Sequence, residues 1–157
     1  MSKHDAVMIH GQEREQALGE IHAQIERWGL TLPDAEPLPL DFGLGDFRTT
    51  GETEWWIANE EDAGYCGKFL FVFDGQTCPW HEHRVKHETF FVVKGSISMR
   101  TAEGTLTLNQ GDTLVMPPGS PHEFTGIGPA LVLEVSMPSI VGDSFFEDKR
   151  IGEGGVI

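Results

Sequence analysis

The stretch PWHEHRVKHETFFVVKG, residues 79–95, places a group of ionisable side chains directly before an apolar run. His81, His83 and Glu88 fall within eight residues, and the run after them has the aromatic and β-branched residues of a buried strand. A buried charge is costly unless it is paired or bound to a metal. The stretch therefore indicates either ion pairs or a metal site built on a strand.

A fourth candidate ligand lies further along the chain. His122 follows a Pro-rich turn, 34 residues after Glu88. His81 and His83 are two residues apart, so on a strand both side chains point to one face. Three imidazoles and one carboxylate form a common ligand set for Mn²⁺, Fe²⁺, Co²⁺, Ni²⁺ or Zn²⁺. We therefore predict a divalent metal bound by His81, His83, Glu88 and His122; the alternative is a row of surface histidines along a strand edge.

The region after Gly51 has the pattern of an all-β protein. Gly and Pro account for 19 and 9 of the 157 residues, which indicates many turns. The expected strands are the runs TEWWIA (53–58), YCGKFLFVFD (65–74), ETFFVVKGSISMRT (88–101), GTLTLN (104–109), DTLVMP (112–117), HEFTGI (122–127) and ALVLEVSM (130–137). Short strands at this spacing, without helical runs between them, predict an antiparallel sandwich or barrel.

The N-terminal segment is predicted to be a helix from Gln12 to Trp28. Leu18, Ile21 and Ile25 recur at helical spacing and define one apolar stripe. Gly29 follows the stripe as a C-terminal cap. The helix, which carries Glu13 and Glu15 in its first turn, is followed by an extended, Pro-rich connector.

These patterns divide the chain into three parts. Residues 1–52 hold the helix and the connector, residues 53–140 form the barrel, and residues 141–157 form a tail that packs on the barrel. We expect the tail to be a surface segment anchored by Phe145 and Phe146.

Charge and composition exclude several classes of partner. The net charge of −14 disfavours nucleic acid, which requires clustered Lys and Arg. It also offers no basic patch for a phosphorylated substrate, so small neutral ligands and metal cations are better matched. No stretch approaches the roughly 20 apolar residues of a membrane span, and no signal peptide is evident, so we expect a cytoplasmic protein. Cys66 and Cys78 do not form a disulfide framework, and we expect both to be reduced.

Two spaced motifs resemble the cupin family. From Gly75 to Gly95 the pattern G-x5-H-x-H-x4-E-x6-G matches the first cupin motif, and from Gly111 to His122 the pattern G-x5-P-x-G-x2-H matches the second. The Asn that usually follows the last histidine by four residues is Gly126 here. The resemblance implies a single jelly-roll β-barrel that holds a metal inside it.

A narrower resemblance is to the D-lyxose ketol-isomerases. It is carried by LPLDFGLGDFRTTG, YCGKFLFVFDGQTCPWHEH, Lys86, LEVSMPS and DSFFEDKRIG, and it covers roughly residues 38–152. It implies a manganese-dependent aldose–ketose isomerase that acts on free sugars, such as D-lyxose and D-xylulose or D-mannose and D-fructose. A metal with four protein ligands keeps two positions open for oxygens on adjacent carbons and acts as a Lewis acid.

Isomerisation also needs a proton carrier, and two residues are candidates. Lys86 shares parity with Glu88, and burial beside a cation lowers the pKa of a lysine, which permits a neutral base. A solvated lysine at a bend is the alternative. Glu134 is a carboxylate within the apolar run LVLEVS, where it is either a catalytic acid or base or a member of a structural ion pair. The pattern leaves open which of Lys86 and Glu134 is the base.

Further residues are candidates for contact with the sugar. Lys68 interrupts the apolar run CGKFLF and is predicted to donate to a substrate hydroxyl. Phe90 and Phe124, together with Trp80, either pack on the C–H face of a sugar or belong to the core. Of the consecutive Trp55 and Trp56, one faces inward, and the outward one indicates a homodimer contact.

The remaining histidines are assigned no chemistry. His87 is expected to face away from the site, in a structural role, while His4, His10 and His22 lie outside the barrel and are expected to be exposed. Two other functions use the same ligands: a cupin dioxygenase with Fe²⁺ and O₂, and a non-catalytic sugar-binding cupin. Lys86 and Glu134 favour the isomerase, because an oxygenase needs no acid–base pair.

Overall fold

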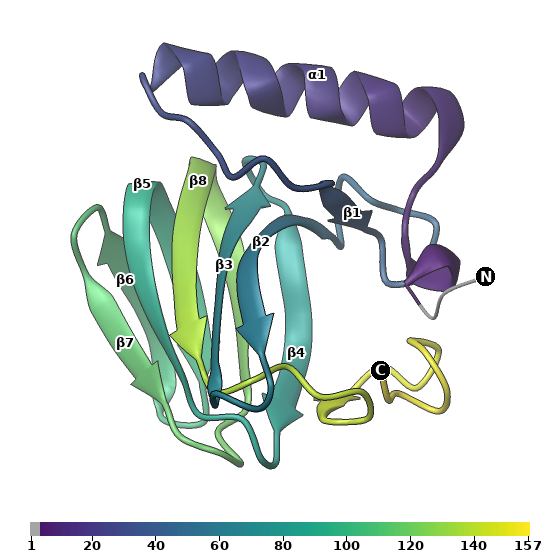
Figure 1. Ribbon diagram of the computed structural model, residues 1–157, viewed down its shortest axis with the longest axis vertical. Helices are drawn as coiled ribbons and strands as arrows, with labels where there is room; N and C mark the ends of the chain where they lie inside the picture. Colours follow the sequence, from purple (N-terminus) through teal and green to yellow (C-terminus); the bar gives the residue numbers. More distant parts are fainter. Residues whose placement is uncertain (1–3) are drawn as a thin grey trace.

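In the computed structural model, which describes residues 4–157, one long helix covers the outside of a curled antiparallel sheet (Figure 1). A short 3-10 turn, η1 (Asp5–Val7), precedes the helix α1 (Gly11–Arg27). The strands are β1 (Leu38–Leu40), β2 (Glu52–Glu60), β3 (Tyr65–Val72), β4 (Thr77–His83), β5 (Glu88–Thr101), β6 (Gly104–Asn109), β7 (Thr113–Met116), β8 (His122–Ser136) and β9 (Ser144–Phe146). The prediction of a mostly β protein with an N-terminal helix is confirmed.

The two long strands β5 and β8 join the two halves of the sheet. The second half of β8 pairs with β3, and its first half pairs with β4, while β5 follows β8 through both halves. The runs 122–127 and 130–137 therefore form one strand and not two. Gly128, with φ of 67°, and register shifts around Lys94 bend this pair without ending it. These pairings describe a curled half-barrel, and the closed jelly-roll barrel stays a prediction.

The concave side of the sheet holds the main core. Its buried side chains come from both halves and include Val72, Val92, Ile97, Met99 and Val132. Alternating residues of each strand point to this side, as expected for strands with one covered face. The core fills one part of the concave side. Buried charged residues, such as Lys68, Lys86 and Glu134, line a pocket beside it.

The convex side is covered at one end by α1 (Figure 1). Ile21 and Ile25 pack against Trp55 and Phe71 of the sheet. Each fully buried aliphatic side chain of this kind contributes about 1.5–3 kcal/mol relative to an exposed one. Gly29, with φ of 69°, ends the helix as predicted, and the backbone N–H of Leu30 donates to the carbonyl of Ile25.

The C-terminal tail is more than a surface segment. Its strand β9 extends the sheet beside β4, with His81 opposite Phe146 and His83 opposite Ser144. Phe146 is buried and stacks on the His81 ring at 5.1 Å between centroids, whereas Phe145 is half-buried under Arg84. The tail therefore forms part of the wall around the histidines.

Two smaller expectations can be compared with the structure. Cys66 and Cys78 are both buried free thiols, as predicted. Among residues 4–157, no helix combines the length and the apolar character that crossing a membrane would require.

Candidate functional site

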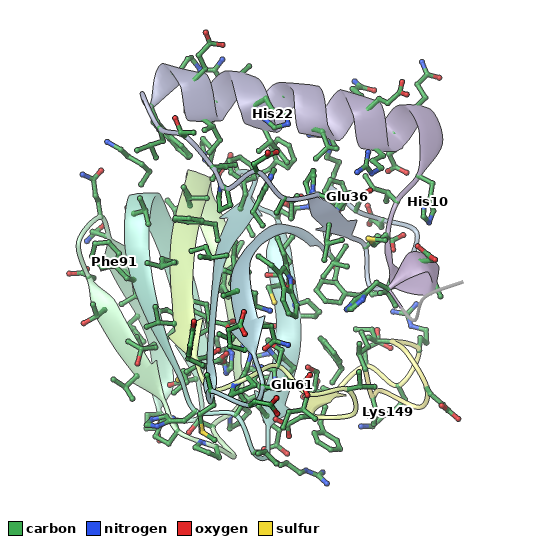
Figure 2. All side chains as sticks on the ribbon, viewed as in Figure 1. His10, His22, Glu36, Glu61, Phe91 and Lys149 are labelled. Carbon is green, nitrogen blue, oxygen red and sulfur yellow. The ribbon has the colours of Figure 1, made fainter. Side chains whose placement is uncertain are left out.

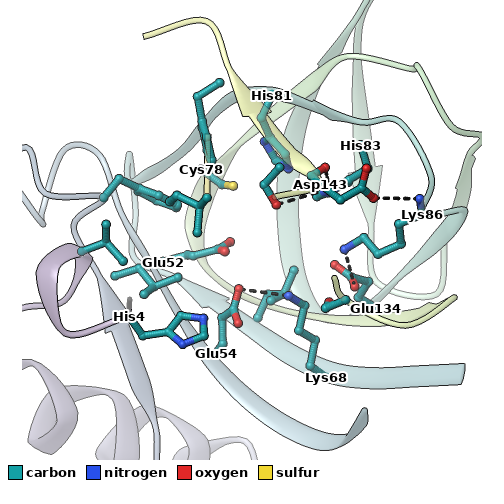
Figure 3. A pocket seen from close by; sticks show the side chains of 18 of the residues that line it. His4, Glu52, Glu54, Lys68, Cys78, His81, His83, Lys86, Glu134 and Asp143 are labelled. Carbon is teal, nitrogen blue, oxygen red and sulfur yellow. Dashed lines mark hydrogen bonds and ion pairs between the residues drawn. The ribbon is translucent and has the colours of Figure 1, made fainter. Parts of the chain in front are cut away.

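The four predicted ligands meet at one point inside the curled sheet. Strand β4 supplies His81 and His83, while Glu88 and His122 are the first residues of β5 and β8. One ligand atom from each lies within 4.8 Å of the others, and all four side chains are buried. The surface-histidine alternative is therefore wrong, and the cluster has the composition and spacing to hold a cation. His81 and His83 are seen on one side of the pocket in Figure 3.

Backbone carbonyls fix the orientation of all three imidazoles. The Nδ1 atoms of His81, His83 and His122 lie 2.7, 3.0 and 2.9 Å from the carbonyl oxygens of Pro79, Asp143 and Ser120, respectively. A carbonyl only accepts, so each Nδ1 carries the proton and each Nε2 keeps its lone pair. The rings are thus held in the tautomer that binds a metal through Nε2.

The centre of the cluster brings several acceptor atoms together, and the Lys86 ammonium is a cation beside them, 3.0 Å from Glu88 Oε2. Glu88 Oε1 lies 3.1 Å from His122 Nε2 and 3.6 Å from His83 Nε2. Both Glu88 oxygens and His122 Nε2 are buried and make no directed hydrogen bond with the residues that the structure describes. Buried acceptors facing one another are unfavourable unless a cation lies between them. Three imidazole nitrogens and one carboxylate fit a divalent transition metal.

The ionisation of the cluster matches this interpretation. Burial, followed by the neighbouring His122, lowers the pKa of His81 well below its usual 6.5, and burial with Lys86 lowers the pKa of His83 to about 4. Burial alone would raise the pKa of Glu88, but His122 and Lys86 outweigh it and hold this pKa well below 4.5. At neutral pH, His81 and His83 are therefore neutral imidazoles and Glu88 is an ionised carboxylate, the forms that bind metals.

Lys86 lies beside the cluster, as predicted from its parity with Glu88. Its Nζ is 3.0 Å from Glu88 Oε2 and 3.1 Å from Glu134 Oε2, and only 3% of Lys86 is exposed. The solvated alternative for Lys86 is therefore wrong. Burial favours a lower pKa for this lysine, but Glu134 and Glu88 outweigh it, so the pKa of Lys86 is raised. The expected lowering is not produced by the protein's own groups, because two carboxylates face the ammonium.

Glu134 projects from near the C-terminal end of β8 into the same space (Figure 3). Its carboxylate accepts hydrogen bonds from Lys86 Nζ and from the Ser136 hydroxyl, both at 3.1 Å. Burial is the main cause that raises the pKa of Glu134, and Lys68 is the main group that opposes it. The two sequence-based alternatives are therefore not exclusive: Glu134 is a member of a buried ion pair, and it also faces the pocket.

Lys68 continues this line of charges toward the next strand. It lies between Trp56 on β2 and Glu134 on β8 in the strand register. Its Nζ is 3.1 Å from Glu54 Oε1 and 5.0 Å from the centre of the Trp56 ring. Lys68, Lys86 and Glu134 all line one pocket, together with His81 and His83.

The aromatic predictions divide into two outcomes. Phe90 and Phe124 belong to the core and also line the pocket, and their contact with a sugar stays a prediction. Trp80 does not line this pocket; its ring lies 3.9 Å from the guanidinium carbon of Arg100.

The expectation for the two consecutive tryptophans requires correction. Trp55 faces the convex side but is covered by α1, and only 1% of it is exposed. Trp56 faces the pocket and donates its indole N–H to Glu54 Oε2 at 2.7 Å. Neither ring is free to make a dimer contact, because α1 covers Trp55 and Trp56 lines the pocket.

One of the remaining histidines was also misplaced. His10 and His22, both labelled in Figure 2, are exposed, as expected, and His87 is exposed as well. His4 is half-buried and lines the pocket, where Figure 3 shows it close to Glu54. The turn η1 brings the N-terminal segment back to the sheet, which a local sequence pattern does not reveal.

Asp143 is a site residue that the sequence analysis missed. Its Oδ1 accepts from the backbone N–H groups of Arg84 and Val85 at 2.9 and 3.0 Å, and its Oδ2 accepts from that of Lys86 at 2.9 Å. These bonds fix the turn that carries Lys86, and the Asp143 carbonyl orients His83. The signal in the sequence is an acidic residue beside Gly142, in a tail already expected to pack on the barrel.

Gly126, which replaces the usual Asn of the second motif, has a steric reason here. A Cβ at this position would lie 2.3 Å from the carbonyl oxygen of Phe73. The backbone of Gly126 also bonds in both directions with the 75–76 turn. Gly126 therefore permits a close approach between two backbone segments, and the four predicted ligands are unaffected.

Comparison with known proteins gives a family match and related sequences. The Cupin domain family matches residues 69–136. The chain is 33% identical to the D-lyxose/D-mannose isomerase of Thermosediminibacter oceani over 139 residues, covering 71% of this chain and 76% of that protein. It is 28% identical to the D-lyxose ketol-isomerase of Cohnella laeviribosi over 181 residues, covering 95% of this chain and 98% of that protein.

Solved structures share the fold. The L-ribose isomerase of Cellulomonas parahominis, solved with L-ribose, has a TM-score of 0.75 at 18% identity and covers 96% of this chain and 98% of its own. The L-ribose isomerase of Acinetobacter sp. DL28, also solved with L-ribose, has a TM-score of 0.66 at 17% identity and covers 85% of this chain and 83% of its own. The similarity therefore extends beyond the residues of the cupin match to α1 and the connector.

Proposed function

The chain belongs to the D-lyxose ketol-isomerase family of cupins, and on this premise we propose that it interconverts a free aldose and its ketose with a divalent metal. The pairs D-lyxose with D-xylulose and D-mannose with D-fructose are the candidate substrates. The observation that carries the proposal is the buried Lys86–Glu134 ion pair beside the buried cluster of four candidate metal ligands. This combination provides both a cation site and a proton carrier.

The proposed metal ligands are the Nε2 atoms of His81, His83 and His122 and the carboxylate of Glu88. When bound, the metal would supply Lewis acidity toward two oxygens on adjacent carbons. Mn²⁺ is our first candidate, supported by the resemblance to the D-lyxose ketol-isomerases and by a ligand set that suits it. Asp143 holds His83 and the 84–86 turn in place around this centre.

Glu134 is the proposed base, and Lys86 the proposed donor to a sugar oxygen. Aldose–ketose isomerisation removes a proton from one carbon and returns a proton to its neighbour. Because the pKa of Lys86 is raised, its ammonium carries no lone pair at neutral pH and serves as a hydrogen-bond donor. The raised pKa of Glu134 lies closer to neutral than that of a free carboxyl, which favours reversible proton transfer.

Three further side chains are proposed to contact the sugar. The Lys68 ammonium projects into the pocket, with Glu54 fixing its position, so it is placed to donate to a hydroxyl. Phe90 and Phe124 offer apolar surface to the C–H face of the sugar. The pocket then combines a few fixed polar groups with aromatic walls, as small-molecule sites commonly do.

A sugar panel tests the proposal. Metal-stripped protein is loaded with Mn²⁺ and incubated with D-lyxose, D-mannose, L-ribose and D-xylose, and the products are separated by chromatography. We expect the ketose of at least one free aldose to form with Mn²⁺ and not without a divalent metal. Absence of any ketose from every sugar, with metal bound, would overturn the proposed function.

We also propose a homodimer, through a different surface from the one expected. Ile57, Val135 and Val115 are 53%, 50% and 53% exposed on the convex side. Val135 pairs with Gly67 on one side and Thr89 on the other, and Thr89 pairs with Val115. Ile57 lies beside Gly67, so three exposed apolar side chains lie on a row that crosses five neighbouring strands, with Gly67 and Thr89 between them. Exposed apolar rows of this kind are typical of protein interfaces.

A further inference from the structure

The pocket contains a second group of charges on the side away from the metal ligands. Glu52 and Glu54 are two residues apart on β2, so both side chains point to the inner face, which Lys68 of β3 shares. Glu52 and Glu54 are 5% and 6% exposed, and both line the pocket (Figure 3). Nothing in the proposed proton transfer uses either carboxyl.

Glu52 is the less satisfied member of this group. Its Oε2 is buried and has no hydrogen-bond partner among residues 4–157. Its neighbours are Glu54 and the buried thiol of Cys78, while Glu54 takes the hydrogen bonds of Lys68 and Trp56. An unsatisfied buried polar group destabilises the folded protein, and an apolar side chain at the same position would avoid this cost. Stability therefore does not explain why a carboxyl is present at position 52.

The strand order indicates which part of a bound sugar would reach Glu52. Glu134 is on β8, Lys68 on the adjacent β3, and Glu54 on β2 beyond it. Two strand spacings amount to roughly 10 Å, a distance that an open-chain sugar with its hydroxyl groups can bridge. A sugar whose reacting carbons lie between Glu134 and the metal ligands thus directs its other end along Lys68 toward Glu54 and Glu52.

We propose that Glu52, Glu54 and Lys68 form a subsite for the sugar hydroxyls remote from the reacting carbons, with Glu52 as a specificity-determining residue. The inference rests on the proposed function and deepens it. The carboxyls accept hydrogen bonds from hydroxyls, and the Lys68 ammonium donates to one. Two carboxyls beside one lysine repel a terminal phosphate, so the subsite selects neutral polyhydroxy chains.

A combined change of residue and substrate tests the subsite. The Mn²⁺-loaded wild type, Glu52→Gln, Glu52→Ala and Glu54→Gln are compared on D-lyxose, 4-deoxy-D-lyxose and 5-deoxy-D-lyxose. Glu60→Gln is the matched control, since Glu60 is on the same strand but exposed. We expect the wild type and the control to favour D-lyxose over at least one deoxy sugar by about 10- to 100-fold in kcat/KM, the size of one hydrogen bond to a charged group.

In Glu52→Ala this preference should fall below about threefold, because the hydroxyl and its partner form one interaction. Glu52→Gln keeps the shape of the side chain and guards against loss of folding in the alanine variant. A preference that is unchanged in Glu52→Ala and Glu54→Gln, while both variants isomerise D-lyxose, would overturn the subsite and leave the proposed function standing.

Equilibrium binding separates the two proposals further. Calorimetry with D-arabinitol, a pentitol that cannot isomerise, reports the subsite without turnover. We expect Glu52→Ala to weaken its binding by about tenfold or more, as for one lost hydrogen bond to a charged group, and Glu60→Gln to leave it unchanged. Equal affinity of wild type and Glu52→Ala, or no binding to the Mn²⁺-loaded wild type, would overturn the subsite. An inactive wild type that binds the pentitol through Glu52 would instead refute only the isomerase proposal.

Discussion

Lys86 and Glu134 form a buried ion pair inside the pocket, with 3.1 Å between Nζ and Oε2. They come from the turn before β5 and from the C-terminal end of β8, elements that meet only in the folded protein. The same ammonium lies 3.0 Å from Glu88, so it links the proposed base to the metal ligands. The pair is consequently expected to act as a unit in both stability and turnover.

The first prediction concerns this pair. Lys86→Met and Glu134→Gln should each hold metal at the wild-type level and lose turnover by roughly 10²–10⁴-fold, the usual effect of removing an acid or base. Lys86→Met should also unfold at a lower temperature, because a broken buried pair costs about 3–5 kcal/mol. The double variant should regain much of this stability but none of the turnover. Initial rates, metal content and thermal unfolding are measured together.

The control for the pair is Lys94→Met, a half-buried lysine on β5 outside the pocket lining. If Lys86→Met or Glu134→Gln kept more than about a third of the wild-type rate with full metal, that residue would have no acid–base role; this limit is far weaker than the usual effect. If Glu134→Gln did not fold, a purely structural ion pair would be the correct interpretation.

The second prediction concerns the metal ligands. His81→Ala and His122→Ala should lose most of the one divalent ion that we expect per chain, because each removes one of four donors. His87→Ala, next to Glu88 but exposed, should keep it. Elemental analysis of the purified proteins decides the matter. Unchanged metal content in both ligand variants would show that the cluster is not the site.

The third prediction is a pH dependence of stability due to Glu52. Burial, followed by Glu54, raises the pKa of Glu52 well above 4.5. The folded protein therefore binds this proton more tightly than the unfolded chain, and Glu52 destabilises the fold increasingly as pH rises from 4.5 to its folded pKa. Glu52→Gln removes this effect, so its melting temperature should exceed that of wild type by a margin that grows with pH.

Thermal unfolding at several pH values measures this margin, with Glu60→Gln as the exposed control on the same strand. A margin that stays constant or shrinks as pH rises above 4.5 would contradict a raised pKa for Glu52. The direction of the change is what the structure predicts, because the carboxyl has lost water without gaining a donor on Oε2.

The fourth prediction concerns assembly. Val135→Glu and Ile57→Glu place a charge in the apolar row on the convex side, which is incompatible with a buried interface. Both variants should be monomeric by light scattering at concentrations where wild type is a dimer. Ile127→Glu is the control, because Ile127 is similarly exposed, at 49%, but lies eight residues from Val135 along β8. A monomeric wild type, or dimeric Val135→Glu and Ile57→Glu variants, would exclude this surface.

The sequence was sufficient for much of the fold because the deciding signals are local. The alternation in residues 88–101 predicts β5 with the bounds that the structure shows. The stripe that includes Leu18 and Ile21 likewise predicts α1 and its buried face. The spacing of His81 and His83 predicts that both side chains share one face of a strand. Glu88 lies on a different strand, beyond a bend, and needed the first cupin motif. His122 needed the second motif, since its position depends on pairing with β4.

The sequence was insufficient where contacts depend on distant segments. His4 reaches the pocket through η1, and Asp143 reaches the 84–86 turn through β9, at separations that no local pattern encodes. The pKa of Lys86 is raised, whereas a lowered pKa was expected, because two carboxylates face its ammonium group. The outward-facing one of Trp55 and Trp56 was expected to contact another chain. Trp55 faces outward, but α1 covers it within the same chain.

The most direct test of a metal-dependent isomerase is reconstitution under argon. Metal-stripped protein is incubated with D-lyxose without O₂, before and after the addition of Mn²⁺, and D-xylulose is measured by chromatography. We expect no conversion before the addition, conversion after it at the rate seen in air, and none with Glu134→Gln loaded with the same metal. Conversion that requires O₂ and yields an oxidised or cleaved product would contradict the proposed function. So would the absence of any ketose from D-lyxose and from every other sugar of the panel with full metal.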